Sequence, residues 1–219
     1  MSVAILVAVF VGFARTYYLR PHFQSAPLPL YLHVHGAVFS AWIALFVVQT
    51  SLVAARRTAV HRQLGVVGAA LAAVMVVVAL IAAIVSGRRN VAAGFETEAL
   101  AFLTTPLSSM AVFLTLVTAA LYYRRRPETH KRLMLLATIC IIDAATARWP
   151  VAFVATSTWA YYALADVFVV AALAYDAVTR RYIHPAYIWG GLLIVVAQVL
   201  RDVVGRTGAW QAFAALLLK

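Results

Sequence analysis

Two histidines and two aspartates lie inside apolar stretches of the sequence, where ionisable groups are costly. His33 and His35 stand in the run LHVHGAVFSAWIALFVVQT, residues 32–50, whereas Asp143 and Asp166 stand in two later apolar runs. A charged group in hydrocarbon costs at least about 2.5–3.5 kcal/mol on insertion scales, so such residues face the protein interior and pair. Histidine and carboxylate are also the side chains that relay protons or ligate metal ions.

The composition predicts the environment of these residues. The chain has 219 residues, of which 65% are hydrophobic and 11% charged, and its mean hydropathy is +0.92. A soluble domain has about 25% charged residues, so this is an integral membrane protein with the lipid bilayer as its partner. The net charge of +11 comes from short Arg clusters between apolar runs. Because that placement is typical of membrane boundaries, we do not expect nucleic-acid binding.

The apolar runs predict an all-α fold, a polytopic membrane bundle of about seven transmembrane helices. The tail 208–219 is too short to span and predicts an interfacial helix. We expect one transmembrane domain, 1–219, with a leading helix 2–19 followed by hairpin-like pairs at 28–86, 98–150 and 158–205. The individual helices are predicted at 2–19, 28–55, 60–86, 98–123, 130–150, 158–178 and 185–205.

Basic residues predict how the bundle is oriented. The connections ARRTAVHR, RRRPETHKR and TRRYIHP follow the second, fourth and sixth predicted helices, so all three lie on one side. The positive-inside bias makes that side cytoplasmic, which puts the N-terminus inside and the C-terminus outside. Each connection also has a histidine four residues after an arginine, at His61, His130 and His184. This recurrence suggests either one hairpin used three times or the general preference of membrane interfaces for Arg clusters and a His at the start of a helix.

Depth can be counted from each predicted helix end at about 1.5 Å per residue. The histidines of the second helix and the two aspartates then fall about 8–12 Å below the outer surface, with further polar residues beside or above them. We call this set the outer polar layer, and its predicted members are His33, His35, Asp143, Arg148, Asp166, Gln198, Arg201 and Asp202.

His33 and His35 point about 200° apart on a regular helix, so only one of them faces the bundle centre. His35 continues at seven-residue spacing to Trp42 and Gln49, which predicts a polar stripe facing inward. The His33 face continues to Gly36 and Ser40, which suits a close contact with another helix. We therefore expect His35 to face inward.

Our first functional hypothesis is that the outer polar layer binds or conducts a small solute or protons. His35, Asp143 and Asp166 would be the titratable members, and Arg148 and Arg201 would supply positive potential. The alternative is structural: His35 pairs with Asp143 or Asp166, and Arg148 or Arg201 pairs with the other carboxylate, as buried pairs that fix how the helices meet. Neither the solute nor the oligomeric state follows from the sequence.

Two other functions remain open. The second hypothesis is a redox protein with b-type haem, ligated by His61 and His130 on the inner side and with His33 or His35 serving another site. The third is a membrane-embedded metalloenzyme or assembly factor, in which His35 and the two aspartates hold a divalent metal ion. Whether the protein is an enzyme stays open. The sequence contains no Walker loop, GxSxG elbow or HExxH motif, so hydrolysis is not favoured by motif.

The run from His33 to Gly68 resembles uncharacterised bacterial membrane-protein families that have HG at the start of one helix, Q near its end and HR-x-LG opening the next. The stretches THKRLMLLAT, 129–138, and IHPAYIWGGLLIVVAQVLR, 183–201, are similar to later segments of those proteins. This resemblance implies a seven-helix protein of the bacterial inner membrane and little chemistry.

A looser likeness is to cytochrome b561-type bundles, which hold two haems between paired histidines on neighbouring helices. The present sequence departs from that pattern, because its outer-side histidines both lie on the second helix, apart from His22 in a connection.

Overall fold

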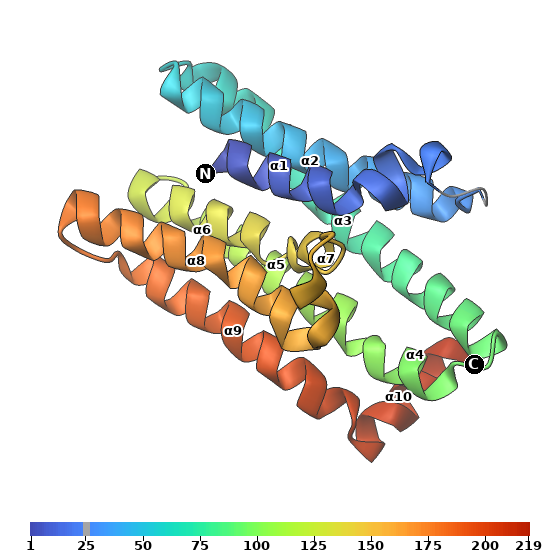
Figure 1. Cartoon of the computed structure of the whole chain (residues 1–219). Helices are drawn as coiled ribbons and strands as arrows, with labels where there is room; N and C mark the ends of the chain where they lie inside the picture. Colours follow the sequence, from blue (N-terminus) through green and yellow to red (C-terminus); the bar gives the residue numbers. More distant parts are fainter. Residues whose placement is uncertain (24–26) are drawn as a thin grey trace.

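The structure is a computed structural model that describes residues 1–23 and 27–219, and it is a bundle of α-helices (Figure 1). No strand occurs among the residues described. Five helical stretches are long and apolar enough to cross a membrane, which confirms the all-α fold and the membrane-type composition. These stretches are Leu30–Ala54, Thr58–Ala92, Glu96–Tyr122, Trp159–Arg180 and Pro185–Gly205.

The long stretches are helices α2 (Leu30–Ala54), α3 (Thr58–Ala92), α8 (Thr158–Arg180) and α9 (Pro185–Gly205), with α4 (Glu96–Phe102) and α5 (Thr104–Tyr122) together forming the fifth. Shorter elements complete the bundle. They are α1 (Ser2–Phe13) with a π-helical turn at Ala14–Tyr18, 3₁₀ turns at Arg20–His22 and Ala152–Thr156, α6 (Pro127–Ile139), α7 (Asp143–Thr146) and α10 (Gly208–Leu218).

The predicted helix 98–123 is interrupted, because α4 ends at Phe102 and α5 begins at Thr104. Pro106 explains the interruption. Its ring cannot donate a backbone hydrogen bond and crowds the carbonyl four residues earlier, which belongs to Phe102. The proline therefore occupies the first turn of α5, where no intrahelical donor is required.

The predicted helix 130–150 is also too long. Helix α6 ends at Ile139, a turn follows over 140–142, and α7 ends at Thr146. Two local features favour these ends. The Asp143 carboxylate accepts a hydrogen bond from the Ala144 N–H at 2.7 Å, a local bond that competes with helix continuation. Pro150 disfavours helical geometry at the residue before it.

Three other predicted boundaries change. The helix predicted at 2–19 turns π-helical at Ala14, and α3 extends past the predicted 60–86 in both directions, to Thr58 and Ala92. The predicted interfacial tail is helix α10, which packs against α4 and the end of α3. There Lys219 pairs with Glu96 at 2.6 Å, so the tail is held to the bundle.

The three basic connections lie at one end of the bundle, at the turns α2–α3, α5–α6 and α8–α9 (Figure 1). The N-terminus is near that end, because the Ser2 hydroxyl accepts a hydrogen bond from the Thr50 hydroxyl, close to the end of α2. The C-terminus lies at the opposite end of the bundle (Figure 1). We call these the basic end and the opposite end.

The apolar core lies where α5 and α6 face the surrounding helices. Phe113 and Leu136 are fully buried there, together with Met75 from α3 and Ile5 from α1. Cys140 is buried in the same core, and it is the only cysteine in the sequence. Apolar packing thus fills the middle of the bundle, and the clusters of charged side chains lie toward its two ends.

Gly12 allows α1 to lie directly against α7, because a Cβ atom at this position would collide with the backbone carbonyl of Ala145. We predict that Gly12→Ala lowers the thermal unfolding temperature of the purified protein in detergent. The reason is that a backbone atom cannot yield as a flexible side chain can, and overpacking of this kind costs about 1–3 kcal/mol.

Gly208→Ala is the matched control, because a Cβ atom at Gly208 meets nothing within 4 Å. Equal unfolding temperatures for the two variants would contradict the close α1–α7 contact.

Candidate functional site

The most buried ion pair toward the opposite end joins α9 to α7. Arg201 Nη1 donates to Asp143 Oδ2 at 2.6 Å, and Arg201 Nε donates to the Ser108 hydroxyl of α5 at 2.6 Å. Arg201 and Asp143 are 4% and 5% exposed. The predicted pairing of Arg201 with one of the two aspartates is therefore present, and its partner is Asp143.

Asp166 of α8 lies beside this pair but has a different partner. Gln198 Nε2 donates to Asp166 Oδ1 at 3.0 Å, and no Lys, Arg or His of the described chain lies within ion-pair distance of Asp166. The charges of Asp143 and Arg201 are close enough to act on Asp166. The structure therefore brings together Asp143, Asp166, Gln198 and Arg201, and we call these four residues with Ser108 the Asp166 site.

Helical spacing explains why these residues meet. Gln198 and Arg201 are three residues apart on α9, and Tyr162 and Asp166 are four apart on α8, so each pair shares one face. The Tyr162 ring lies under the Arg201 guanidinium, 5.6 Å from centroid to Cζ. Neighbouring Thr146 donates to the Tyr161 carbonyl at 2.9 Å and ties α7 to α8.

Two predicted members of the outer polar layer lie outside this site. Asp202 was expected in the layer, but it faces outward and pairs with Arg206 one turn later at 3.1 Å. His33 has an exposed side chain. Their neighbours on the same helices, Arg201 and His35, are the more buried residues, because adjacent or alternate positions on a helix point in different directions.

His35 is half-buried but does not pair with an aspartate, so that prediction is wrong. Its ring stacks on Phe39 of the same helix with centroids 4.3 Å apart, and its buried Nδ1 has no hydrogen-bond partner among the described residues. Arg148 is close enough for its charge to act on His35. The Arg148 guanidinium is exposed, lies 4.9 Å from the centroid of the Phe13 ring, and forms no ion pair in the described chain.

The close contact predicted for the Gly36 face is present. The Tyr17 ring packs where a Gly36 side chain would be, and the Tyr18 and Ser40 hydroxyls are 2.7 Å apart. The π-helical turn of residues 14–18 supplies both tyrosines, so this turn aims them at α2.

The third hypothesis needs His35, Asp143 and Asp166 in one metal site. Among the described residues, no group of three or more His, Cys, Asp or Glu side chains is close enough to hold a metal ion. Because α2 places His35 beside Phe39 and Arg148 instead of the two aspartates, this ligand set is not assembled.

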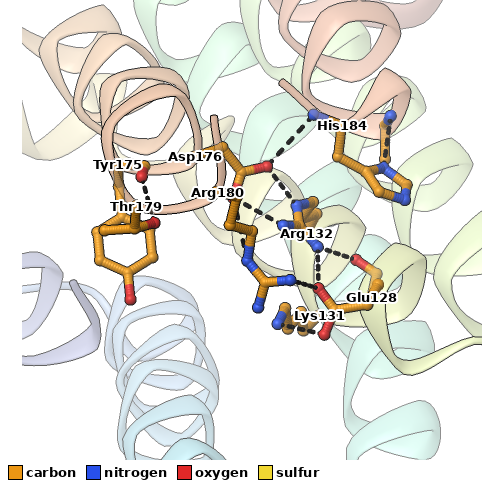
Figure 2. Close-up of polar contacts among 9 residues, drawn as sticks. Glu128, Lys131, Arg132, Tyr175, Asp176, Thr179, Arg180 and His184 are labelled. Carbon is orange, nitrogen blue, oxygen red and sulfur yellow. Dashed lines mark hydrogen bonds and ion pairs between the residues drawn. The ribbon is translucent and has the colours of Figure 1, made fainter. Parts of the chain in front are cut away.

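The basic end contains a charge cluster that the sequence argument missed. Arg132 of α6 is 2% exposed and binds Asp176 of α8 with two parallel hydrogen bonds, Nε to Oδ2 at 2.7 Å and Nη2 to Oδ1 at 2.6 Å. Figure 2 shows the guanidinium directed at this carboxylate. Such fork-to-fork pairing is the strongest geometry available to an Arg–carboxylate pair.

Glu128 extends the cluster to the protein surface. Its Oε2 accepts from Arg132 Nη1 at 2.7 Å and from Arg180 at 2.8 Å, and its Oε1 accepts from Lys131 at 2.7 Å (Figure 2). The four named residues and Asp176 are called the basic-end clamp below.

The clamp also holds the start of α9. The backbone N–H of His184 donates to Asp176 Oδ2 at 3.3 Å, and the His184 ring accepts from the Ala186 N–H at 3.1 Å as the cap of α9. One signal for the clamp was available in the sequence. Asp176 and Arg180 are four residues apart, a spacing that places an acid and a base on one helix face.

Two of the recurring histidines meet at the basic end. The His61 and His130 rings lie 6.3 Å apart between centroids, with planes at 77°. In both helices the backbone N–H of the histidine donates to the backbone carbonyl of the arginine four residues earlier. This arginine is Arg57 for His61 and Arg126 for His130. His184 differs because it precedes its helix. His33 and His35 lie in the first turns of α2, away from the α2–α3 turn, so they cannot join the same ligand set.

No protein-family model, curated protein or solved structure matches the chain.

Removing one partner of the buried clamp pair leaves an uncompensated charge. We predict that Asp176→Asn lowers the free energy of unfolding by about 3 kcal/mol or more, the range found when one partner of a buried pair is removed. Thermal unfolding in detergent measures this change as a lower transition temperature.

Asp202→Asn is the control, because it breaks an exposed pair that is worth about 0–1 kcal/mol. The double variant Arg132→Met with Asp176→Leu should regain part of the lost stability, since neither charge remains. If Asp176→Asn were as stable as the control, the clamp would not stabilise the bundle.

Proposed function

We propose that the chain is a multi-pass membrane protein in which Asp166 binds and releases a proton as part of proton binding or conduction. The observation that carries this proposal is the nature of the partner of Asp166. Its side chain is bonded by a neutral amide, Gln198, whereas its neighbour Asp143 is bonded by a guanidinium.

The partner determines how readily each carboxyl takes up a proton. A carboxylate within a membrane that lacks a cation is costly, so its neutral form is favoured, whereas an ion pair favours the charged form. Both forms of Asp166 can keep the Gln198 bond, because a protonated carboxyl still has an acceptor oxygen. Asp166 can thus change charge without breaking the contact between α8 and α9.

The same geometry favours a proton over an anionic solute. An anion at the Asp166 site would need a cation with unused donors there, and the cation of this site, Arg201, already donates to Asp143 and Ser108. Displacing these partners would leave Asp143 buried without its counter-charge. Of the two aspartates of the site, Asp166 is the one to which no cation is bonded.

We predict that Asp166→Asn abolishes proton movement in vesicles while the protein still folds. Asparagine has the shape of the neutral carboxyl but cannot ionise. The test measures internal pH with a trapped dye in proteoliposomes after an external acid step, with valinomycin and potassium to cancel the membrane potential. The flux should fall to that of protein-free vesicles.

Asp202→Asn is the matched control, because this carboxylate is exposed and bonded to Arg206. Asp143→Asn should instead lower the unfolding temperature, because it leaves the buried Arg201 without its counter-charge. Full proton flux in Asp166→Asn, or no flux above protein-free vesicles in the unmodified protein, would show that the proposal is wrong.

We further propose that the chain crosses the membrane seven times, with the basic end in the cytoplasm. The basic turns at one end of the bundle support this orientation, because Arg and Lys are retained on the cytoplasmic side. The residues 2–18 and 127–146 would supply the two crossings beyond the five long apolar stretches. The bacterial inner membrane remains the predicted location.

We predict that a cysteine at position 125 is protected from a membrane-impermeant maleimide added to intact cells, and that a cysteine at position 97 is labelled. Arg125 and Thr97 are exposed and lie at the basic end and the opposite end. Cys140 is buried, so it provides little background. The reverse labelling pattern would invert the proposed orientation.

A further inference from the structure

We infer that His61 and His130 form a ligand site for a transition-metal centre, held from opposite sides by two imidazoles at the basic end. This inference is independent of the proton site at Asp166. It rests on the separation of the two rings, on the partners of their nitrogen atoms, and on an unpartnered amide beside them.

The separation of the rings is compatible with two imidazoles that share one metal ion in a nearly linear arrangement. Metal–nitrogen bonds of about 2.0–2.1 Å, with about 1.1 Å from each nitrogen to its ring centre, place the two centroids at most about 6.4 Å apart. The observed centroid distance is 6.3 Å. A direct N–H···N hydrogen bond of about 3 Å in line with the rings would place the centroids only about 5.2 Å apart.

The hydrogen bond of the His130 ring leaves one of its nitrogens for a ligand. His130 Nδ1 lies 2.8 Å from the carbonyl oxygen of Ala120. A carbonyl only accepts, so Nδ1 carries the proton and Nε2 keeps its lone pair. Metal-bound histidines almost always show this arrangement, in which the second nitrogen donates to a carbonyl or carboxylate.

His61 presents the complementary situation. Its Nδ1 is buried and has no hydrogen-bond partner in the described part of the chain. Buried polar atoms are paired in most proteins, so an unpaired one calls for an external partner such as an ion or water. Helix α3 starts one turn earlier and fixes the His61 backbone through the Arg57 carbonyl at 3.1 Å.

Gln49 places another unsatisfied atom next to His61. Its Oε1 is buried without a partner in the described residues, and the Gln49 backbone is a hydrogen-bond partner of the His61 ring. Its side chain reaches α3, where a Cβ atom on Gly65 would be 3.9 Å from Gln49 Nε2. An amide oxygen in this position can accept a hydrogen bond from a metal-bound water.

Charge limits the metals that suit the site. The ligands are two neutral imidazoles, and the positive charge of Arg62 acts on His61. A centre of low net charge is therefore favoured, and imidazole suits both copper and iron. Two metal centres of this kind can be ligated by a pair of imidazoles: a Cu(I) ion, and the iron of a haem with one histidine on each face.

The test is binding to the purified full chain in detergent, with two probes. Cu(I) is titrated anaerobically against a chromogenic chelator, and haem is titrated while the Soret band is recorded. We expect stoichiometric binding of one probe, which identifies the source. His61→Ala and His130→Ala should each weaken that binding by at least about tenfold. Loss of a residue that only hydrogen-bonds a metal ligand already weakens metal binding by about tenfold or more, and loss of the ligand itself should weaken it further.

His33→Ala is the matched control, because this histidine is exposed and lies at the other end of α2. His61→Phe and His130→Phe keep an aromatic ring and so separate packing from ligation. Folded Phe variants that lose probe binding support the inference. Binding of neither probe by the unmodified protein, or binding retained in the Phe variants, would overturn it.

Discussion

Each buried guanidinium in this bundle requires a carboxylate from another helix, and this requirement governs how the helices meet. Arg132 forms an ion pair with Asp176 at the basic end, and Arg201 forms one with Asp143 toward the opposite end. The first pair joins α6 to α8, and the second joins α9 to α7. Because an unpaired charge in an apolar surrounding is so costly, any rotation or slide that separates a pair is disfavoured. The two pairs therefore fix the relative positions of helices whose remaining contacts are largely apolar and only weakly directional.

The sequence placed the members of one pair, Arg201 and Asp143, among the candidates for pairing and missed the other pair, for a physical reason. Arg201, Asp143 and Asp166 could be found because each interrupts an apolar run, and depth counted from the helix ends places them in one layer. Arg132 follows a run of basic residues at a predicted membrane boundary. The positive-inside bias accounts for basic residues there, so nothing in the sequence indicated that Arg132 is buried and paired. Its burial depends on the rotation of α6 against α8, and the packing between helices distant in sequence decides that rotation. The break at Pro106 and the end of α6 at Ile139 both have local causes, whereas the close approach of α7 to Gly12 depends on packing between segments distant in sequence.

The histidines show the same division between pattern and packing. The seven-residue spacing correctly predicted that His35 is more buried than His33, because one face of α2 must look inward. The spacing could not show that Phe39 covers the His35 ring, since that contact depends on rotamers. The repeated Arg-to-His spacing marked His61 and His130 without indicating that the two rings meet. Their contact requires the first turns of α3 and α6 to converge, which is a property of the whole bundle.

Saturation of hydrogen-bonding capacity separates the polar groups that hold the bundle from those available for chemistry. In Arg132 the Nε, Nη1 and Nη2 atoms all donate to Asp176 or Glu128, and Arg201 bonds both a carboxylate and a hydroxyl. Groups of this kind stabilise one arrangement and have little capacity for a further partner. His61 Nδ1 and Gln49 Oε1 are buried without partners in the described chain, and Asp166 has an amide in place of a cation. A proton or metal ion bound at these incompletely paired groups would lower their free energy. The two buried arginines have no unused hydrogen-bonding capacity for such a partner. The chemistry of this protein is therefore expected where pairing is incomplete, next to the pairs that keep the helices in place.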